Sequence, residues 1–314
     1  KGMIKKVFSV FSLVVLMTAL AFTTACSKKE ASSAGSDKKN VVVTTSFLAD
    51  MVEQIAGDSV NIDMIIPAGE DPHLYVAKPD DLTKIQKSDL LLYHGIHFEG
   101  KMVEALEKKG TAVTKNFKDD EIGVMEEDGK KIKDPHFWFN IDLYKKAVDV
   151  ANEELGKLVP EKKDEYSKKA EAYKAELDKL NEENKKLLSE IPKENRYLVT
   201  PHDAFNYFSR AYKIEVVAPQ GVSTDSELAN KDIDKTAQFI VDHKIKAIFA
   251  ESTTNPERMN KLKEIVKSKG FDVKVVSGED KELFSDSLAP KGSKGDTFID
   301  MYRHNVQLMN ENLK

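Results

Sequence analysis

The feature that most constrains the fold is a long amphipathic segment in the middle of the chain, residues 161–191. Its apolar side chains recur three and four residues apart: Tyr166, Ala170, Tyr173, Leu177, Leu180, Leu187 and Ile191. Most other positions are Lys or Glu, so the pattern predicts one helix, roughly 45 Å long, with a narrow apolar stripe. A solvated coiled-coil arm is the alternative, but the stripe is short and Asn184 interrupts it. We interpret the segment as a rigid helix that joins two lobes.

Short β-rich runs alternate with amphipathic helical segments on both sides of the long helix. The expected strands are residues 40–45, 60–66, 89–93 and 111–114 before it, and 197–200, 214–217, 247–250 and 273–276 after it. This alternation predicts an α/β fold class: two lobes, each with a mainly parallel sheet flanked by helices, joined by one long rigid helix. In such sheets, ligands bind beyond the carboxyl ends of the strands.

The N-terminus has the pattern of an export signal. Lys5 and Lys6 form a positive region, residues 7–22 form an apolar run too short for a typical membrane span, and small residues lead to Cys26, the only cysteine. This pattern is similar to a bacterial lipobox, whose cysteine takes lipid after cleavage, although Thr23 stands where leucine is usual. An ordinary secretory signal with an incidental cysteine is the alternative. A single cysteine leaves no intramolecular disulfide.

We therefore expect five regions. They are a signal peptide (1–25), a flexible tether (26–39), an N-terminal α/β lobe (40–159), a linking helix (160–193) and a C-terminal α/β lobe (194–314). Removal of the signal peptide takes away three lysines and no acid, so the formal net charge changes from −5 to −8. An acidic protein without a basic patch is not expected to bind nucleic acid. We expect an exported monomer, lipid-anchored at the outer face of the cell membrane or in the periplasm.

Three of the seven histidines directly follow a proline: His73, His136 and His202. Proline fixes its own φ and stiffens the turn that presents the next side chain. A fourth candidate, Asp286, lies between two serines far downstream. Three imidazoles and one carboxylate suit Zn²⁺ and tolerate Mn²⁺ or Fe²⁺. The alternative is that the Pro-His pairs are ordinary loop residues.

If all four side chains bind one ion, no coordination position remains for a water nucleophile, which favours carriage over catalysis. Glu251 follows a buried strand, and we expect it near the same site; its alternative role is to cap the helix that starts near Pro256. His94 and His97 follow another strand. A helical turn would place both on one side as an auxiliary metal site, but a packing or surface role is favoured.

The motifs, taken in order, closely resemble a known family. They are Asp-Pro-His73, Asp-Pro-His136-Phe-Trp, Thr-Pro-His202-Asp-Ala-Phe, Glu251-Ser-Thr-Thr-Asn-Pro and Ser-Asp286-Ser-Leu. The family is that of the metal-binding lipoproteins of bacterial ABC importers, the TroA-type zinc/manganese solute-binding proteins. The resemblance implies that a metal binds between two α/β lobes and is delivered to a membrane permease. It also implies that His73, His136, His202 and Asp286 are the ligands, with Glu251 close to them.

Two departures from the family patterns bear on the metal. Manganese-type members carry glutamate where this chain has His202, and a nitrogen ligand shifts the preference toward zinc. Zinc-type members often have a histidine-rich loop before the second ligand, whereas residues 119–133 contain no histidine here. The resemblance thus implies a non-enzymatic carrier of Zn²⁺ and/or Mn²⁺. The competing hypotheses are a secreted zinc-dependent hydrolase with Glu251 or Asp286 as general base, a chelated-iron carrier, and a surface adhesin.

Overall fold

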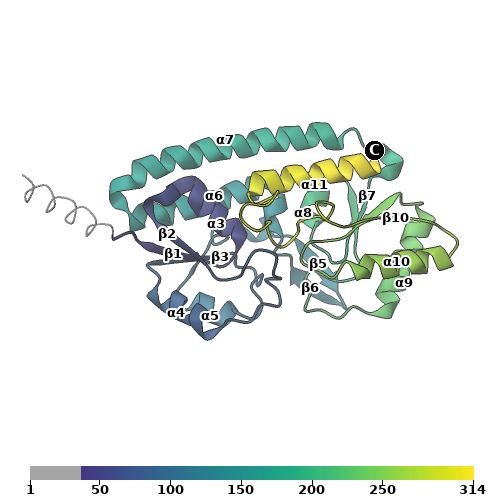
Figure 1. Cartoon of the computed structure of the whole chain (residues 1–314), viewed down its shortest axis with the longest axis horizontal. Coiled ribbons are helices and arrows are strands. Elements are labelled where there is room, and N and C mark those ends of the chain that lie inside the picture. The colour runs from purple at the N-terminus through teal and green to yellow at the C-terminus, as the bar shows by residue number, and fades with distance from the viewer. Residues whose placement is uncertain (1–36) are drawn as a thin grey trace, which may run out of the picture. The chain divides into compact units, whose positions relative to one another are not determined.

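Helices and strands alternate along the part of the chain described by this computed structural model, residues 37–314 (Figure 1). The expected signal peptide, Cys26 and most of the expected tether lie outside these residues. Residues 39–314 form one compact unit. Among the described residues, no helix is both long enough and apolar enough to span a membrane.

A four-stranded parallel sheet forms the centre of the region before the long helix. Its strands lie in the order β2 (Asn61–Met64), β1 (Asn40–Val43), β3 (Leu90–Tyr93) and β4 (Thr111–Ala112). β1 and β3 consist almost entirely of Val and Leu and are buried at nearly every position. Such continuous apolar runs are typical of parallel strands that are covered on both faces.

Alternate residues of β1 point to two different hydrophobic clusters. Val41 and Val43 pack in the cluster that contains α3 (Ser46–Ala56) and α6 (Ile141–Leu158). Val42 packs on the other face, where the helices are α4 (Pro79–Lys87) and α5 (Val103–Glu107). Figure 1 shows these two pairs of helices on opposite sides of the sheet.

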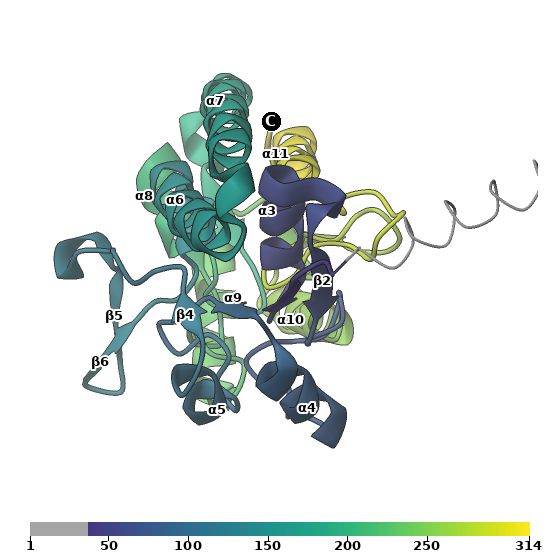
Figure 2. The same cartoon turned by 90° about the vertical axis from the view of Figure 1, so that its left-hand side faces the viewer.

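The long helix is α7 (Lys163–Leu188), preceded by a 3₁₀ turn, Pro160–Lys162. It is slightly shorter than predicted. It packs against α6, α3 and the C-terminal helix α11 (Phe298–Leu313). Figure 1 shows α7 running along both halves of the chain, and Figure 2, which looks along α7, shows these three helices beside it. The coiled-coil alternative is therefore wrong. Asn184, the interruption in the stripe, is buried and donates a hydrogen bond to the Tyr212 hydroxyl at 3.2 Å.

The region after α7 again contains parallel strands, but they form two pairs and not one continuous ladder. β7 pairs with β8 and β9 pairs with β10, and every strand is only three residues long. These elements are β7 (Tyr197–Val199), α8 (Asn206–Tyr212), β8 (Glu215–Val217), α9 (Asn230–Asp242), β9 (Ala247–Phe249), α10 (Glu257–Ser268) and β10 (Lys274–Val276). The fold class is thus confirmed, while the residue limits of the two lobes stay a prediction.

The charged segment 119–133 contains an antiparallel hairpin, β5 (Val124–Glu127) and β6 (Lys130–Lys133). Asp128 and Gly129 form its turn, and both have positive φ, 49° and 75°. An Asp-Gly pair with this backbone is typical of a two-residue hairpin turn. The Glu127 carboxylate accepts a hydrogen bond from the Val222 amide at 2.7 Å, so the hairpin contacts the second half of the chain.

Candidate metal centre

The candidate ligands lie in loops that follow strands. His73 follows β2, His202 follows β7 and Asp286 follows β10, each beyond the carboxyl end of a parallel strand. His136 lies between the β5–β6 hairpin and α6. Carboxyl ends of parallel strands are the usual place for binding loops in α/β proteins. The two halves of the chain, before and after α7, each contribute two of the four residues.

Two of these loops use the same local turn. In Asp71-Pro72-His73, the Asp71 carboxylate accepts a hydrogen bond from the His73 amide at 2.9 Å. In the second Asp-Pro-His sequence, Asp134 accepts from the His136 amide at 3.0 Å. The aspartate side chain closes the turn two residues on, and the proline between restricts φ. The repeated tripeptide is therefore a compact turn that presents an imidazole.

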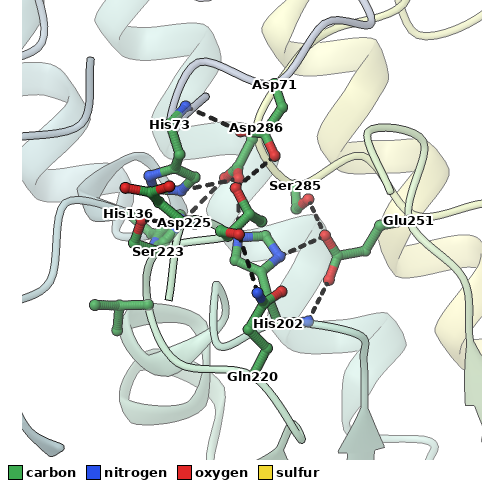
Figure 3. A network of polar contacts seen from close by, with 12 residues as sticks. Asp71, His73, His136, His202, Gln220, Ser223, Asp225, Glu251, Ser285 and Asp286 are labelled. Carbon is green, nitrogen blue, oxygen red and sulfur yellow. Dashed lines mark hydrogen bonds and ion pairs between the residues drawn. The ribbon is translucent and has the colours of Figure 1, made fainter. Parts of the chain in front are cut away.

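The structure brings the four candidate side chains together. One possible ligand atom from each of His73, His136, His202 and Asp286 lies within 4.8 Å of all the others, and all four residues are buried. The Nε2 atoms of the three histidines lie 3.1, 3.0 and 2.8 Å, respectively, from oxygens of the Asp286 carboxylate (Figure 3). Residues more than 200 positions apart thus surround one point, as the sequence predicted.

These short distances are charge contacts without hydrogen-bond geometry. The three Nε2 atoms and both Asp286 oxygens are buried and have no hydrogen-bond partner among the described residues. Leaving buried polar groups unpaired is costly, and five in one place call for an explanation. A single divalent cation bound by three imidazoles and one carboxylate would satisfy them together. The donor set therefore fits a transition-metal ion.

The electrostatics of the cluster are those of a tightly coupled ion-pair network. Burial lowers the pKa of His136, but the Asp286 and Asp134 carboxylates outweigh it and raise this pKa to about 9. Burial likewise opposes protonation of His202, yet Glu251 and Asp286 hold its pKa well above the usual value. Burial raises the pKa of Asp286, but the three histidines hold it well below the usual range. A metal ion must therefore displace protons from this site.

A carboxylate behind His136 fixes the orientation of its ring. The Nδ1 atom lies 2.7 Å from Asp134 Oδ1, and the Asn206 amide donates to the other Asp134 oxygen at 3.0 Å. Such a contact on Nδ1 directs Nε2 toward the centre of the cluster and increases its basicity. Asp134 was not assigned a role from the sequence, although its place two residues before a candidate ligand was the available signal.

Glu251 has the same relation to His202. Its Oε2 lies 2.6 Å from His202 Nδ1, its Oε1 accepts from the His202 amide at 3.0 Å, and the Ser285 hydroxyl donates to Oε2 at 2.7 Å. The structure thus places Glu251 against a candidate ligand. Its carboxylate does not cap α10, the helix after Pro256, which has no side-chain cap.

His94 and His97 do not form an auxiliary metal site. Gly95, Ile96 and His97 all have positive φ, so the helical turn that the disfavoured auxiliary site required does not form, and His97 is exposed. His94 is buried, its Nε2 lies 2.7 Å from Thr45 Oγ1, and burial lowers its pKa to about 3. Its ring packs on Trp138, 5.4 Å away between centroids, and Trp138 packs in turn on His136 at 5.2 Å. The favoured packing role of His94 is confirmed.

A buried cluster of three histidines and one aspartate, on an α/β fold crossed by one long helix, defines a transition-metal solute-binding protein of an import system. The family described as zinc-uptake complex component A, periplasmic, matches residues 41–312, and the chain belongs to this family. It is thus a transport protein and not an enzyme.

Relatives with different metals in their names match the chain closely. It is 35% identical over 308 residues to the manganese-binding lipoprotein MntA of Bacillus subtilis, covering 95% of this chain and 99% of that protein. It is 38% identical over 290 residues to the zinc-binding protein TroA of Treponema pallidum, covering 91% of each. A solved structure of a TroA, studied for its metal-binding specificity, superposes with a TM-score of 0.88 at 65% identity, covering 88% of this chain and all of that one.

Proposed function

We propose that the chain captures one Zn²⁺ or Mn²⁺ ion with His73, His136, His202 and Asp286 and delivers it to the permease of an ABC importer. The observation that carries this proposal is the convergence of four buried donors whose polar atoms lack other partners. The ion is cargo: with four protein ligands, a tetrahedral site leaves no position for a reacting water.

The donor set supports zinc as the preferred ion with manganese as an accepted one. Three nitrogens and one oxygen suit Zn²⁺, while manganese is usually bound by more oxygen ligands. The β5–β6 hairpin carries no histidine that could feed zinc to the site. Relatives named for zinc and for manganese are both close, and Fe²⁺ is a third candidate because imidazole also suits iron.

Assignment of the chain as the metal-binding component of an importer implies that it delivers the ion to the permease from outside the membrane. Relatives named as lipoproteins align with nearly the whole chain, which supports lipidation of Cys26 after export and a location at the outer face of the cell membrane or in the periplasm. We propose that the protein acts there as a monomer. The partner is then a permease in that membrane, and no nucleic acid is involved.

We further propose that metal binding moves the ligand loops and not whole lobes. α7 packs along α6, α3 and α11, so elements from both halves of the chain are held to one helix. Wide hinge rotation would break this packing, whereas small loop shifts would preserve it. A pair of crystal structures with and without metal tests this point, and a large lobe rotation would contradict it.

The site assignment is tested by His202→Ala with His243→Ala as the matched control. His243 is exposed and stacks on Phe239 within the C-terminal half, away from the cluster. We expect metal-stripped wild-type protein and His243→Ala to bind one equivalent of Zn²⁺ in calorimetry, with Mn²⁺ competing. His202→Ala should lose tight binding. An unchanged affinity in His202→Ala would contradict the assignment.

A further inference from the structure

The four candidate ligands are enclosed by protein. Their side chains are at most 2% exposed. An ion of any kind can enter or leave such a site only if part of the surrounding structure moves. The question is which element opens, and the contacts between the two halves of the chain decide it.

One loop reaches from the second half of the chain to the first. We call residues 220–226, which follow β8, the strap. Three of its residues make polar contacts with separate elements before α7: the Val222 amide with Glu127 (2.7 Å), the Thr224 hydroxyl with Asp71 (2.6 Å), and the Asp225 carboxylate with Lys101 (3.1 Å). The strap therefore bridges the two halves beside the metal site (Figure 3).

The contact between Thr224 and Asp71 is linked to the candidate ligand His73. Asp71 Oδ2 accepts a hydrogen bond from the Thr224 hydroxyl at 2.6 Å. Asp71 Oδ1 accepts a hydrogen bond from the His73 backbone amide at 2.9 Å. Within residues 37–314, the structure shows no hydrogen bond to Nδ1 of His73. The position of this imidazole therefore depends on its turn, and the turn depends on a carboxylate that the strap holds.

The base of the strap is fixed to the second half of the chain. The Gln220 side-chain amide donates hydrogen bonds to the backbone carbonyls of Thr224 and Ser226 at 3.0 and 2.8 Å. The oxygen of the same side chain accepts a hydrogen bond from Arg258 at 2.8 Å. The Ser226 hydroxyl closes a turn on the Ser223 carbonyl. These bonds hold the strap's shape, so it can leave the first half as a unit without unfolding.

The aromatic contacts between the two halves are poorly suited to opening. Phe139 stacks on Phe205 with centroids 4.7 Å apart, and the Tyr302 hydroxyl donates to the Phe139 carbonyl, all in the main hydrophobic cluster. Separating them would expose apolar surface to water. The strap contacts are polar and one is solvent-exposed, with Lys101 43% and Asp225 55% exposed, so water can replace them.

We propose that the strap is the gate of the metal site, and that Thr224 and Asp71 are positioning residues that couple its closure to His73. When Thr224 leaves Asp71, the turn that holds His73 loosens and the ion gains a path to solvent. This inference rests on the proposed function, because it assumes that the four-residue cluster holds the cargo ion.

The test is the rate of Zn²⁺ release into an excess of a chromogenic chelator, measured by stopped flow. Thr224→Val keeps the shape of the side chain and removes the hydroxyl. We expect it to release Zn²⁺ about tenfold faster or more, the usual effect of losing one hydrogen bond to a charged group, with one ion still bound at saturation. Thr224→Ser restores the hydroxyl and should release at nearly the wild-type rate.

Thr236→Val is the matched control, because the Thr236 hydroxyl bonds only to the Asp232 carbonyl in its own helix. It should release zinc like the wild type. The gate proposal would be overturned if folded Thr224→Val released Zn²⁺ at the wild-type rate, or if Thr224→Ser released it as fast as Thr224→Val. Failure of the proposed function is a separate outcome: the wild type would then bind no ion, or His202→Ala would bind as well as the wild type.

Discussion

The histidines of the metal centre are held in two different ways. His136 and His202 each have a carboxylate within 2.7 Å of Nδ1, from Asp134 and Glu251. His73 has no such partner among the described residues, and is placed through its backbone by Asp71. Two imidazoles are thus oriented before an ion arrives, while the third lies in a loop that the strap holds in place.

The difference indicates a division of tasks within one site. Preset ligands reduce the ordering cost of binding and raise affinity, as outer hydrogen bonds to metal ligands generally do. A ligand held by breakable contacts gives a route for exchange with solvent. We therefore expect changes behind His136 and His202 to act on affinity at equilibrium, and changes at the strap to act on the release rate.

The largest effect is expected from Asp286→Asn, because Asp286 contacts all three imidazoles regardless of how they are held. The replacement keeps the shape but removes the only anionic ligand. Calorimetry should show loss of tight Zn²⁺ binding, a greater loss than the 10–100-fold typical of outer partners. Since Asp286 raises the pKa of His136, this pKa should also fall in NMR titration. Retained affinity would show that the cluster is not the metal site.

The second-largest effect on Zn²⁺ affinity is expected from lowering the pH. In the metal-free protein the Asp286 and Asp134 carboxylates raise the pKa of His136 to about 9 against the effect of burial, so this imidazole carries a proton at neutral pH. Displacing this one proton lowers the apparent affinity about tenfold per pH unit, and hence about a hundredfold between pH 7.5 and 5.5. The raised pKa of His202 makes this dependence steeper. Calorimetry in buffers of different ionisation enthalpy counts the released protons. Equal affinity at both pH values would refute imidazole coordination.

Glu251→Gln separates the two kinds of histidine. It removes the charge behind His202 without touching a ligand atom, and should weaken Zn²⁺ binding by about 10–100-fold. Asp134→Asn should act similarly through His136. Competition against a chelator of known affinity measures both. If Glu251→Gln had no effect on affinity, the oriented imidazoles would have no advantage over His73, and the comparison would fail.

The smallest effect is expected at the exposed end of the strap. Lys101 and Asp225 form a solvent-exposed ion pair, and such pairs contribute about 0.2–1 kcal/mol. Lys101→Met should therefore speed zinc release by at most about fivefold, and the difference from the wild type should shrink as salt is raised. Stopped-flow release at low and high NaCl measures this. A larger, salt-independent effect would mean that the buried Thr224–Asp71 contact is not the main closure.

Local sequence patterns predicted much of the candidate site. The Asp-Pro-His turns were visible because proline and aspartate act within three residues, and the ligand set was implied by family motifs. The strap was not found, because Thr224 and Asp71 are 153 positions apart and Thr224 lies in no distinctive pattern. The alternative of a helical turn at His94–His97 is excluded by three consecutive positive φ values, which the spacing of the two histidines does not reveal.

The sequence by itself determined the long central helix and the α/β alternation, since each depends on side-chain type and short spacing, and its motifs implied the four donor residues through the family resemblance. Only the tertiary structure decided that three Nε2 atoms meet one carboxylate, that Glu251 supports His202, and that a loop after β8 closes on Asp71. These features depend on long-range packing between halves of the chain, and local propensity carries no information about distances across that packing.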